Sequence, residues 1–231
     1  MYFGGLQKTT LVDYPGKVAA TVFTIGCNFR CPYCHNPELV LPELSKKQPK
    51  ITEKEVLNFL KERRKLLEGL CITGGEPTIQ SDLIDFIKKV KDLGFLIKLD
   101  TNGSCPDVLN SLIEQKLIDY VAMDIKVPKE KYHLFTQGID FIKQIEKSIQ
   151  ILKNNQIDYE FRTTLIPEVL EERDILAIVE WIKPTPRYFL QRFKNDKVLD
   201  KKFKNIQAWS EQRTRALFKK IKPYFSECNI R

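Results

Sequence analysis

Residues 18–36 read VAATVFTIGCNFRCPYCHN, an apolar run that leads directly into three closely spaced cysteines. Residues 18–25 are mostly β-branched or apolar, which is typical of a buried strand, and Gly26 ends this run. Parallel α/β folds build their sites from the loops at the carboxyl ends of their strands. The stretch therefore predicts a strand with a functional loop at its carboxyl end.

The same alternation continues along the chain. Segments between the apolar runs carry the periodic apolar residues of amphipathic helices. Helix boundaries are indicated by a capping box at Thr52 and Glu55, an N-cap at Ser81, a stop at Gly94 and a first turn at Pro106. Five further strands are expected, over residues 69–73, 95–100, 120–126, 159–166 and 187–193.

Six strand-then-helix units imply a parallel sheet with right-handed crossovers. An open doubly wound sheet and a partial (β/α) barrel both fit this α/β pattern, and six units are too few for the eight-fold barrel. The length suits one domain over residues 1–231. Its core is expected over about residues 18–195, followed by a helical extension over residues 196–231 with a last helix near residues 206–221.

Composition limits the classes of partner. No apolar run approaches twenty residues and no signal pattern is present, so we expect no membrane span and a cytoplasmic location. The net charge is +8, and basic residues are concentrated in residues 192–205 and 213–222. A solvated lysine-rich surface and a docking face for an acidic protein both explain this charge. No nucleic-acid-binding motif accompanies it, so a nucleic acid is not expected as a partner.

Cys27, Cys31 and Cys34 follow the spacing Cys-x3-Cys-x2-Cys. Unligated thiols at this spacing would be prone to oxidation. A zinc ion could use His35 as a fourth ligand, but His35 directly follows Cys34, where reaching the same ion is awkward. A 4Fe–4S cluster held by three thiolates would leave one iron open to a substrate or cofactor, and the pattern favours this interpretation. The other cysteines are interpreted as small packing residues: Cys71, Cys105 and Cys228.

Polar groups also follow the other predicted strands. GGEP (74–77), DTNG (100–103) and MDIK (123–126) end the second, third and fourth strands, while Arg162 and Arg192 lie in the fifth and sixth. Because the carboxyl ends of parallel strands meet at one edge, we expect these groups to form one site.

The glycine-rich motif has two explanations. Gly74 and Gly75 could merely turn the chain, or they could let the backbone approach a ligand closely. In the second case Glu76 could face an ammonium group.

The aspartates also have more than one explanation. Asn-Gly makes DTNG a strong turn sequence, but Asp100 and Asp124 could also share a small cation. Lys126 could pair with Asp124 or hold an anionic ligand group. His133 is more typical of the surface or of packing than of catalysis.

Residues 4–39, GGLQKTTLVDYPGKVAATVFTIGCNFRCPYCHNPEL, resemble the activating proteins of glycyl-radical enzymes within the radical S-adenosylmethionine superfamily. The cysteine loop is similar to the cluster loop of that superfamily, and GGEP to the motif that receives the amino group of S-adenosylmethionine. HNPE after the last cysteine is typical of an activase. The longer form of the anaerobic ribonucleoside-triphosphate reductase activating proteins is most similar, and pyruvate formate-lyase activating enzyme is also similar.

The resemblance implies a partial (β/α)6 barrel of the TIM type, with the cluster at the C-terminal ends of the strands. Cys27, Cys31 and Cys34 would ligate one 4Fe–4S cluster, and S-adenosylmethionine would bind its open iron. No catalytic residue beyond the cluster and this cofactor is implied. The residues implied to contact the cofactor are Tyr33, Asn36, Gly74, Gly75, Glu76, Asp124, Lys126 and Arg162. A monovalent cation is implied at Asp100, Thr101 and Asp124.

The implied reaction uses one electron from a flavodoxin or ferredoxin to cleave S-adenosylmethionine to a 5′-deoxyadenosyl radical. This radical would remove a hydrogen atom from a glycine of a partner, for which an anaerobic (class III) ribonucleotide reductase is expected. The alternative is a radical enzyme acting on a small molecule such as a pterin, similar to 7-carboxy-7-deazaguanine synthase. A more remote alternative is a non-enzymatic zinc-binding interaction module.

Overall fold

The computed structural model describes residues 1–231, which form one open, curved sheet of nine strands. All six predicted strands are present, and they run parallel to one another in chain order, so each one pairs with the next. The sheet does not close, as expected for a partial barrel. These strands are β2 (Ala19–Thr24), β4 (Gly69–Gly74), β5 (Leu96–Thr101), β6 (Tyr120–Asp124), β7 (Asp158–Leu165) and β8 (Arg187–Arg192).

Three further strands, which were not predicted, extend this sheet at its edges. β1 (Tyr2–Thr10) lies antiparallel beside β2, and β3 (Ile51–Thr52) lies antiparallel beside β1. β9 (Glu227–Ile230) lies parallel beside β8, so residues 196–231, expected to be helical, also contain a strand. These strands are short or rich in glycine and polar residues, and their pairing depends on a neighbouring strand rather than on their own propensity.

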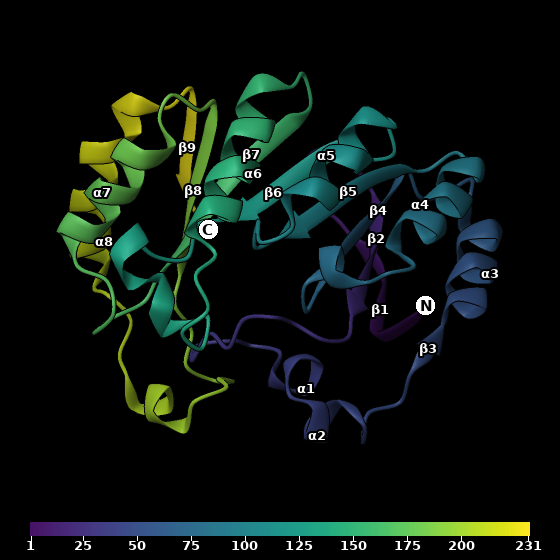
Figure 1. Ribbon diagram of the computed structural model, residues 1–231, viewed down its shortest axis with the longest axis horizontal. Coiled ribbons are helices and arrows are strands. Elements are labelled where there is room, and N and C mark those ends of the chain that lie inside the picture. Colours follow the sequence, from purple (N-terminus) through teal and green to yellow (C-terminus); the bar gives the residue numbers. More distant parts are fainter.

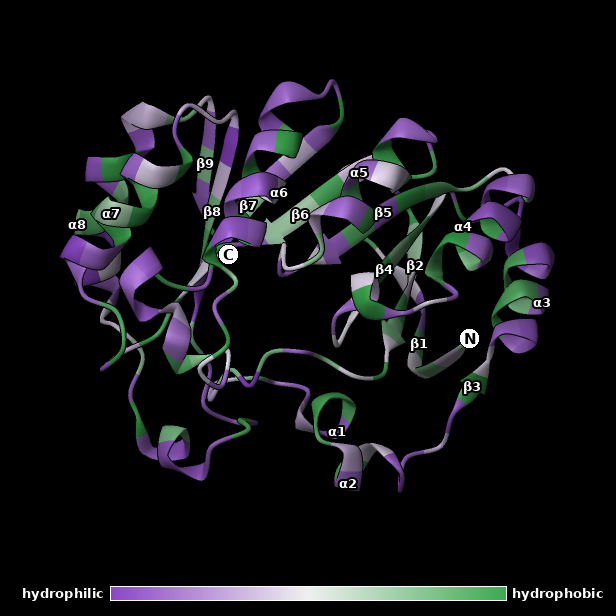
Figure 2. Cartoon of the chain, in the orientation of Figure 1, coloured by the Kyte–Doolittle hydropathy of each residue, from purple (hydrophilic) through white to green (hydrophobic).

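The larger helices cover the outer face of the curved sheet (Figure 1). Each of them shows both colours in Figure 2, because its apolar side packs on the sheet and its polar side faces solvent. None of the helices combines the length and the hydrophobicity that crossing a bilayer requires. These helices are α3 (Glu53–Arg63), α4 (Leu83–Asp92), α5 (Pro106–Glu114), α6 (Ile142–Asn154), α7 (Glu172–Ile182) and α8 (Glu211–Ile221).

Smaller elements lie across the open side of the arc in Figure 1. The short helices α1 (Pro37–Val40) and α2 (Pro42–Ser45) directly follow the cysteine loop, and the 3₁₀ turn η3 (Lys201–Asn205) lies in the segment after β8. The other 3₁₀ turns are η1 (Pro77–Ile79), η2 (Lys129–Leu134) and η4 (Lys222–Tyr224).

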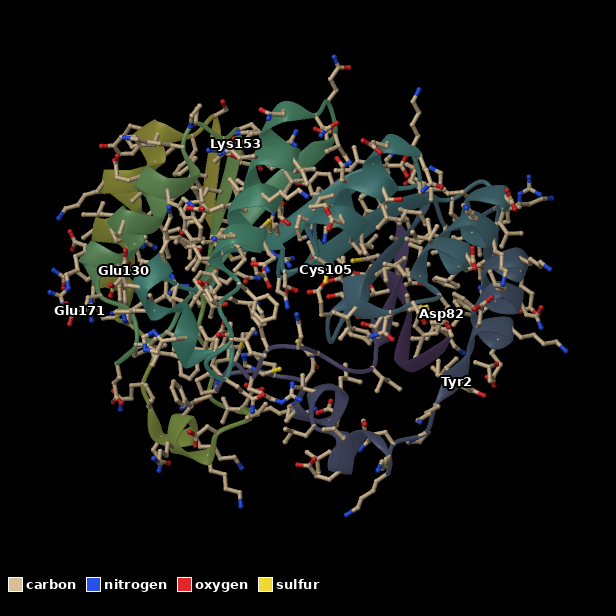
Figure 3. The ribbon with its side chains drawn as sticks, in the orientation of Figure 1. Tyr2, Asp82, Cys105, Glu130, Lys153 and Glu171 are labelled. Atoms are coloured by element: carbon tan, nitrogen blue, oxygen red, sulfur yellow. The ribbon has the colours of Figure 1, made fainter.

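One predicted helix start is confirmed and another is wrong. Thr52 and Glu55 form the capping box of α3, with the Glu55 amide donating to the Thr52 hydroxyl at 3.2 Å. Ser81 does not cap α4, which begins two residues later, after Asp82. The Asp82 carboxylate pairs with the N-terminal amine of Met1 at 2.8 Å, and the Asp82 label in Figure 3 lies close to where Figure 1 marks the N-terminus. The residue before α4 is therefore held by the N-terminal amine, which is distant in the sequence.

The remaining helix boundaries follow the sequence signals closely. Gly94 directly follows the C-cap of α4 with a φ of 87°, a backbone conformation that favours glycine. Pro106 is the first residue of α5. The last helix, expected near residues 206–221, begins only at Glu211, because Ser210 caps it there by accepting a hydrogen bond from the Arg213 amide at 3.2 Å.

Candidate functional site

A cavity of about 390 Å³ lies at the carboxyl ends of the parallel strands. The structure brings most of the predicted site residues to it. The expectation that Arg192 joins the site is wrong, because Arg192 is exposed and lies outside the cavity, and His133 is exposed and lies outside it as well. The predicted residues that line the cavity are Cys27, Cys31, Tyr33, Cys34, Asn36, Gly74, Gly75, Glu76, Asp100, Thr101, Asp124, Lys126 and Arg162.

The cysteine loop is held in place by hydrogen bonds from three separate parts of the chain. The Gly26 amide donates to the Leu39 carbonyl at 2.7 Å, and the Arg30 amide donates to the Phe135 carbonyl at 2.8 Å. The amide of Asp200, in the segment after β8, donates to the Pro32 carbonyl at 2.8 Å. The loop is therefore positioned by tertiary contacts as well as by its own sequence.

The three thiols are mostly buried in the wall of the cavity. Burial raises the pKa of Cys27 to about 12 and that of Cys31 to about 11, and it also raises the pKa of Cys34. Without a metal these groups would stay protonated at neutral pH, so a metal would have to displace their protons. The Phe29 amide donates to the Cys27 sulfur at 3.4 Å, a contact that suits a metal-bound thiolate.

A 4Fe–4S cluster fits this donor set. Three soft sulfur ligands come from one loop and line one cavity, and the other three cysteines of the chain lie outside that lining. The hydroxyl of Tyr33 is buried without a hydrogen-bond partner, so this wall also offers a polar atom to a ligand.

The paired glycines are required by the close approach of two strand ends. Gly74 has a φ of 108°, and a Cβ built at Gly75 would lie 1.9 Å from the carbonyl oxygen of Gly26. The Gly75 amide donates to the Thr24 carbonyl at 2.9 Å, and the Glu76 amide donates to the Gly26 carbonyl at 2.8 Å. These contacts hold the cysteine loop against the end of β4. The amides of Gly75 and Glu76 already donate hydrogen bonds within the protein.

Glu76 joins the glycine-rich motif to the loop after β5. Its buried carboxylate accepts hydrogen bonds from the amide and hydroxyl of Thr78, from the Thr101 hydroxyl at 2.7 Å and from the Asn102 amide at 2.7 Å. Burial raises the pKa of Glu76, although these four donors oppose the rise. A ligand ammonium group would therefore be a fifth partner of this carboxylate.

Two asparagines that were not predicted join the cysteine loop to the loop after β5. The Asn102 side chain donates to the Asn28 carbonyl oxygen at 2.9 Å, and the Asn28 side chain donates to the Ser104 hydroxyl at 2.8 Å. Both asparagines lie inside motifs that were recognised for other residues, CNFRC and DTNG. Their amide side chains could have marked them as candidate site residues, but only the fold brings them together.

Two aspartates and three basic residues form a charged cluster in the cavity wall and just beneath it. Arg162 bridges the aspartates, donating from Nε to Asp124 at 2.8 Å and from a terminal nitrogen to Asp100 at 3.2 Å. Lys126 pairs with Asp124 at 2.7 Å, and Lys98 pairs with Asp100. Lys126 thus forms the ion pair that its position beside Asp124 suggested.

The charges of this cluster stabilise its ionised state. Burial alone would raise the pKa of Asp124, but Arg162 and Lys126 outweigh burial and lower it to about 2. The pKa of Asp100 is also lowered, because Arg162 and Lys98 outweigh the effect of its burial. The implied monovalent cation would have to share these oxygens, since a basic group of the protein contacts every oxygen of both carboxylates.

Two of the scattered cysteines have ordinary positions, and one does not. Cys105 precedes α5, as Figure 3 shows, and Cys228 is buried in β9. Cys71 is buried in β4 with its sulfur 3.7 Å from the Lys98 ammonium nitrogen, so it borders the charged cluster rather than packing only among apolar groups.

Comparison with known proteins gives a family for this arrangement. The family model described as the radical SAM superfamily matches residues 21–182. A protein of Methanocaldococcus jannaschii, named as a glycyl-radical enzyme activating enzyme, is 37% identical over 235 residues, covering 98% of this chain and 94% of the relative. The pyruvate formate-lyase-activating enzyme of Clostridium pasteurianum is 28% identical, covering 94% and 95%.

Proteins of another activity in the superfamily are also similar. The 7-carboxy-7-deazaguanine synthase of Thermoplasma acidophilum is 29% identical, covering 64% of this chain and 66% of the relative. The crystal structure of QueE from Escherichia coli superposes with a TM-score of 0.60 and 17% identity, covering 100% of this chain and 93% of that chain. At this identity the superposition supports the fold alone.

The match over most of the chain therefore assigns the fold and the cofactors, a 4Fe–4S cluster and S-adenosylmethionine. This chain is an enzyme that belongs to the radical S-adenosylmethionine superfamily.

Proposed function

We propose that this enzyme generates a glycyl radical on a partner enzyme, and that the partner is an anaerobic ribonucleotide reductase. The observation that carries the proposal is the similarity to an activating enzyme along almost the whole chain, including the segments on both sides of the cavity. When bound, the cluster and S-adenosylmethionine supply a carbon-centred radical that can remove a hydrogen atom.

The residues of the cavity have distinct proposed roles. Cys27, Cys31 and Cys34 hold the cluster, and the glycine-rich motif keeps their loop against β4. The surplus positive charge beside Lys126 attracts the carboxylate of S-adenosylmethionine. Tyr33 and Asn36 line the wall on the cysteine-loop side, where the buried Tyr33 hydroxyl has no partner within the protein.

An acidic electron carrier, a flavodoxin or a ferredoxin, is the proposed donor. Residues 192–205 contain six basic and two acidic residues. They contact the cysteine loop through the hydrogen bond from the Asp200 amide to the Pro32 carbonyl, and they contact the following helix α1 through the ion pair of Lys197 with Glu38. A basic surface beside the cluster loop favours docking of a negatively charged partner at a short distance from the cluster.

The proposal is tested with the cluster-loaded, reduced enzyme under anaerobic conditions. We expect that mixing it with S-adenosylmethionine and an anaerobic ribonucleotide reductase yields a glycyl-radical doublet in the EPR spectrum. A reductase whose target glycine is replaced by alanine is the control and should give no doublet. If no doublet appears although 5′-deoxyadenosine is formed, the reductase is not the partner.

The alternative is a reaction on a small molecule, as the name of the Thermoplasma relative suggests. That relative covers 64% of this chain, against 98% for the Methanocaldococcus relative, which favours the activating function. Cleavage of S-adenosylmethionine that is stimulated by a pterin in the absence of any partner protein would support the alternative. Membership in an enzyme superfamily leaves the zinc-binding interaction module without support.

A further inference from the structure

We propose that this chain carries its own cation in the cofactor site. In this proposal the Lys98 ammonium and the Arg162 guanidinium replace the monovalent metal ion that the resemblance implies beside Asp100 and Asp124. One part of the test rests on the proposed cofactor site, and the other part, which measures ion binding by the cofactor-free chain, does not.

The first argument is that every carboxylate oxygen of the pair already has a basic partner. One oxygen of Asp100 pairs with Lys98 and the other accepts from Arg162 at 3.2 Å. One oxygen of Asp124 accepts from Arg162 at 2.8 Å and the other pairs with Lys126 at 2.7 Å. Hard metal ions need several oxygen ligands, so one would have to compete for these oxygens with three basic groups of its own charge.

Thr101, the third residue of the implied cation site, is also engaged elsewhere. Its hydroxyl donates to Glu76 at 2.7 Å and accepts from the Gly103 amide at 3.1 Å. The Thr101 hydroxyl therefore serves to position the loop after β5.

The buried position of the Lys98 ammonium requires an opposite charge beside it. It lies two residues before Asp100 in β5, on the same face of the strand, and its side chain is 3% exposed. An ammonium group buried without a counter-charge would be strongly destabilising. The polar contacts of the Lys98 ammonium are the Asp100 carboxylate and the Cys71 sulfur. The position of Lys98 therefore lets it neutralise the charge of Asp100.

The balance of charge makes a metal ion unnecessary. Lys98, Arg162 and Lys126 contribute three positive charges, and Asp100 and Asp124 contribute two negative charges. One positive charge remains to balance a ligand carboxylate in the cavity. Binding and cleavage of the cofactor should therefore not depend on which alkali cation is present.

The ion-binding test uses the cofactor-free chain and thallium(I) as a probe for potassium. We expect no saturable thallium signal by NMR from the wild type, and the same thermal midpoint in potassium, sodium and tetramethylammonium chloride at equal ionic strength. Lys98→Met exposes one Asp100 oxygen, so this variant should bind thallium saturably and melt at a higher temperature in potassium than in tetramethylammonium. Lys88→Met, at an exposed position on α4, is the matched control and should behave as the wild type.

The activity test measures 5′-deoxyadenosine formed by the cluster-loaded enzyme. The wild type should give equal yields in the three salts. The Lys98→Met variant should lose activity about tenfold in tetramethylammonium, equivalent to ~1.4 kcal/mol, and regain it in potassium.

Either of two results would overturn the proposal: saturable thallium binding by the wild type, or a folded Lys98→Met variant as insensitive to the salt as the wild type. If circular dichroism shows that this variant does not fold, the wild-type titration decides alone. A wild type that forms no 5′-deoxyadenosine in any salt would contradict the proposed function instead, while the thallium titration would still decide about the cation.

Discussion

The carbonyl oxygen of Gly26 lies so close to Gly75 that a Cβ at position 75 would come within 1.9 Å of it. The glycine-rich motif and the cysteine loop therefore meet backbone to backbone. The contact explains why a residue without a side chain follows β4, since both partners are main-chain atoms and neither can rotate away.

Gly75→Ala should destabilise the protein by at least ~3 kcal/mol, the upper end of the cost of overpacking a close-packed site. It should also weaken cluster binding, because the cysteine loop must move. Denaturant unfolding checks the stability, and iron content after anaerobic reconstitution checks the cluster. Gly94→Ala is the control, because its positive φ costs about 1 kcal/mol but its surroundings are open. Equal effects of both changes would contradict the close-contact argument.

Cys31→Ala should prevent stable cluster binding, because two thiolates hold the cube poorly. Iron and sulfide analysis after anaerobic reconstitution should give about four irons per wild-type chain and a small fraction of that for the variant. Cys105→Ala removes a thiol outside the cavity and should retain the full iron content. A Cys31→Ala chain that keeps the wild-type iron content would exclude Cys31 as a ligand.

Glu76→Gln should destabilise the fold by ~1–3 kcal/mol. The NH2 group of glutamine would replace one carboxylate oxygen and face either the Thr78 amide or the Asn102 amide, which can only donate, and it would leave that buried donor unsatisfied. The free energy of unfolding in urea measures the loss. Glu114→Gln makes the same chemical change on the surface of α5 and should have almost no effect. A neutral result for Glu76→Gln would mean that the Glu76 carboxylate is already protonated.

Acid should unfold the protein partly through Asp124. The pKa of this carboxyl is lowered from its ordinary 3.8 to about 2, so the folded state binds its proton less readily than the unfolded state. This stabilisation is complete above pH 4 and is lost as the pH falls from 4 toward 2. It amounts to ~2 kcal/mol.

The unfolding free energy of the Asp124→Asn variant should therefore fall less steeply over this interval than that of the wild type. Urea unfolding at a series of pH values measures both slopes. Parallel slopes would show that the pairs with Arg162 and Lys126 do not lower the pKa of Asp124.

Reversing the charge of Lys201 and Lys202 together should slow reduction of the cluster by a flavodoxin or ferredoxin. Both lysines are exposed in η3, next to the contact of Asp200 with the cysteine loop. Stopped-flow reduction at several ionic strengths should show a slower rate and a weaker dependence on salt than in the wild type. Lys219→Glu with Lys222→Glu, at the outer helix α8 and the following turn, is the matched control and should leave the rate unchanged (Figure 1). An equal effect of both pairs would indicate only a response to net charge.

The repeating pattern of apolar runs and amphipathic helices was enough to predict all six central strands, because burial on both faces of a parallel strand leaves a local signal. The edge strand β9 left no such signal, since four residues pair with β8 only after the chain has folded. The prediction that Ser81 caps α4 is wrong for a similar reason. The capping preference of serine does not reveal that Asp82 precedes the helix and pairs with the distant N-terminus.

The cysteine spacing by itself determined the cofactor class of this protein, because three thiols on one short loop have a chemistry that depends little on the rest of the chain. The tertiary structure alone decided what surrounds that loop. It placed Arg162 of β7 against Asp100 of β5 and Asp124 of β6, where the guanidinium pairs with both carboxylates. Ligand spacing is local in the sequence, whereas the neutralisation of a buried charge depends on which strands the fold sets side by side.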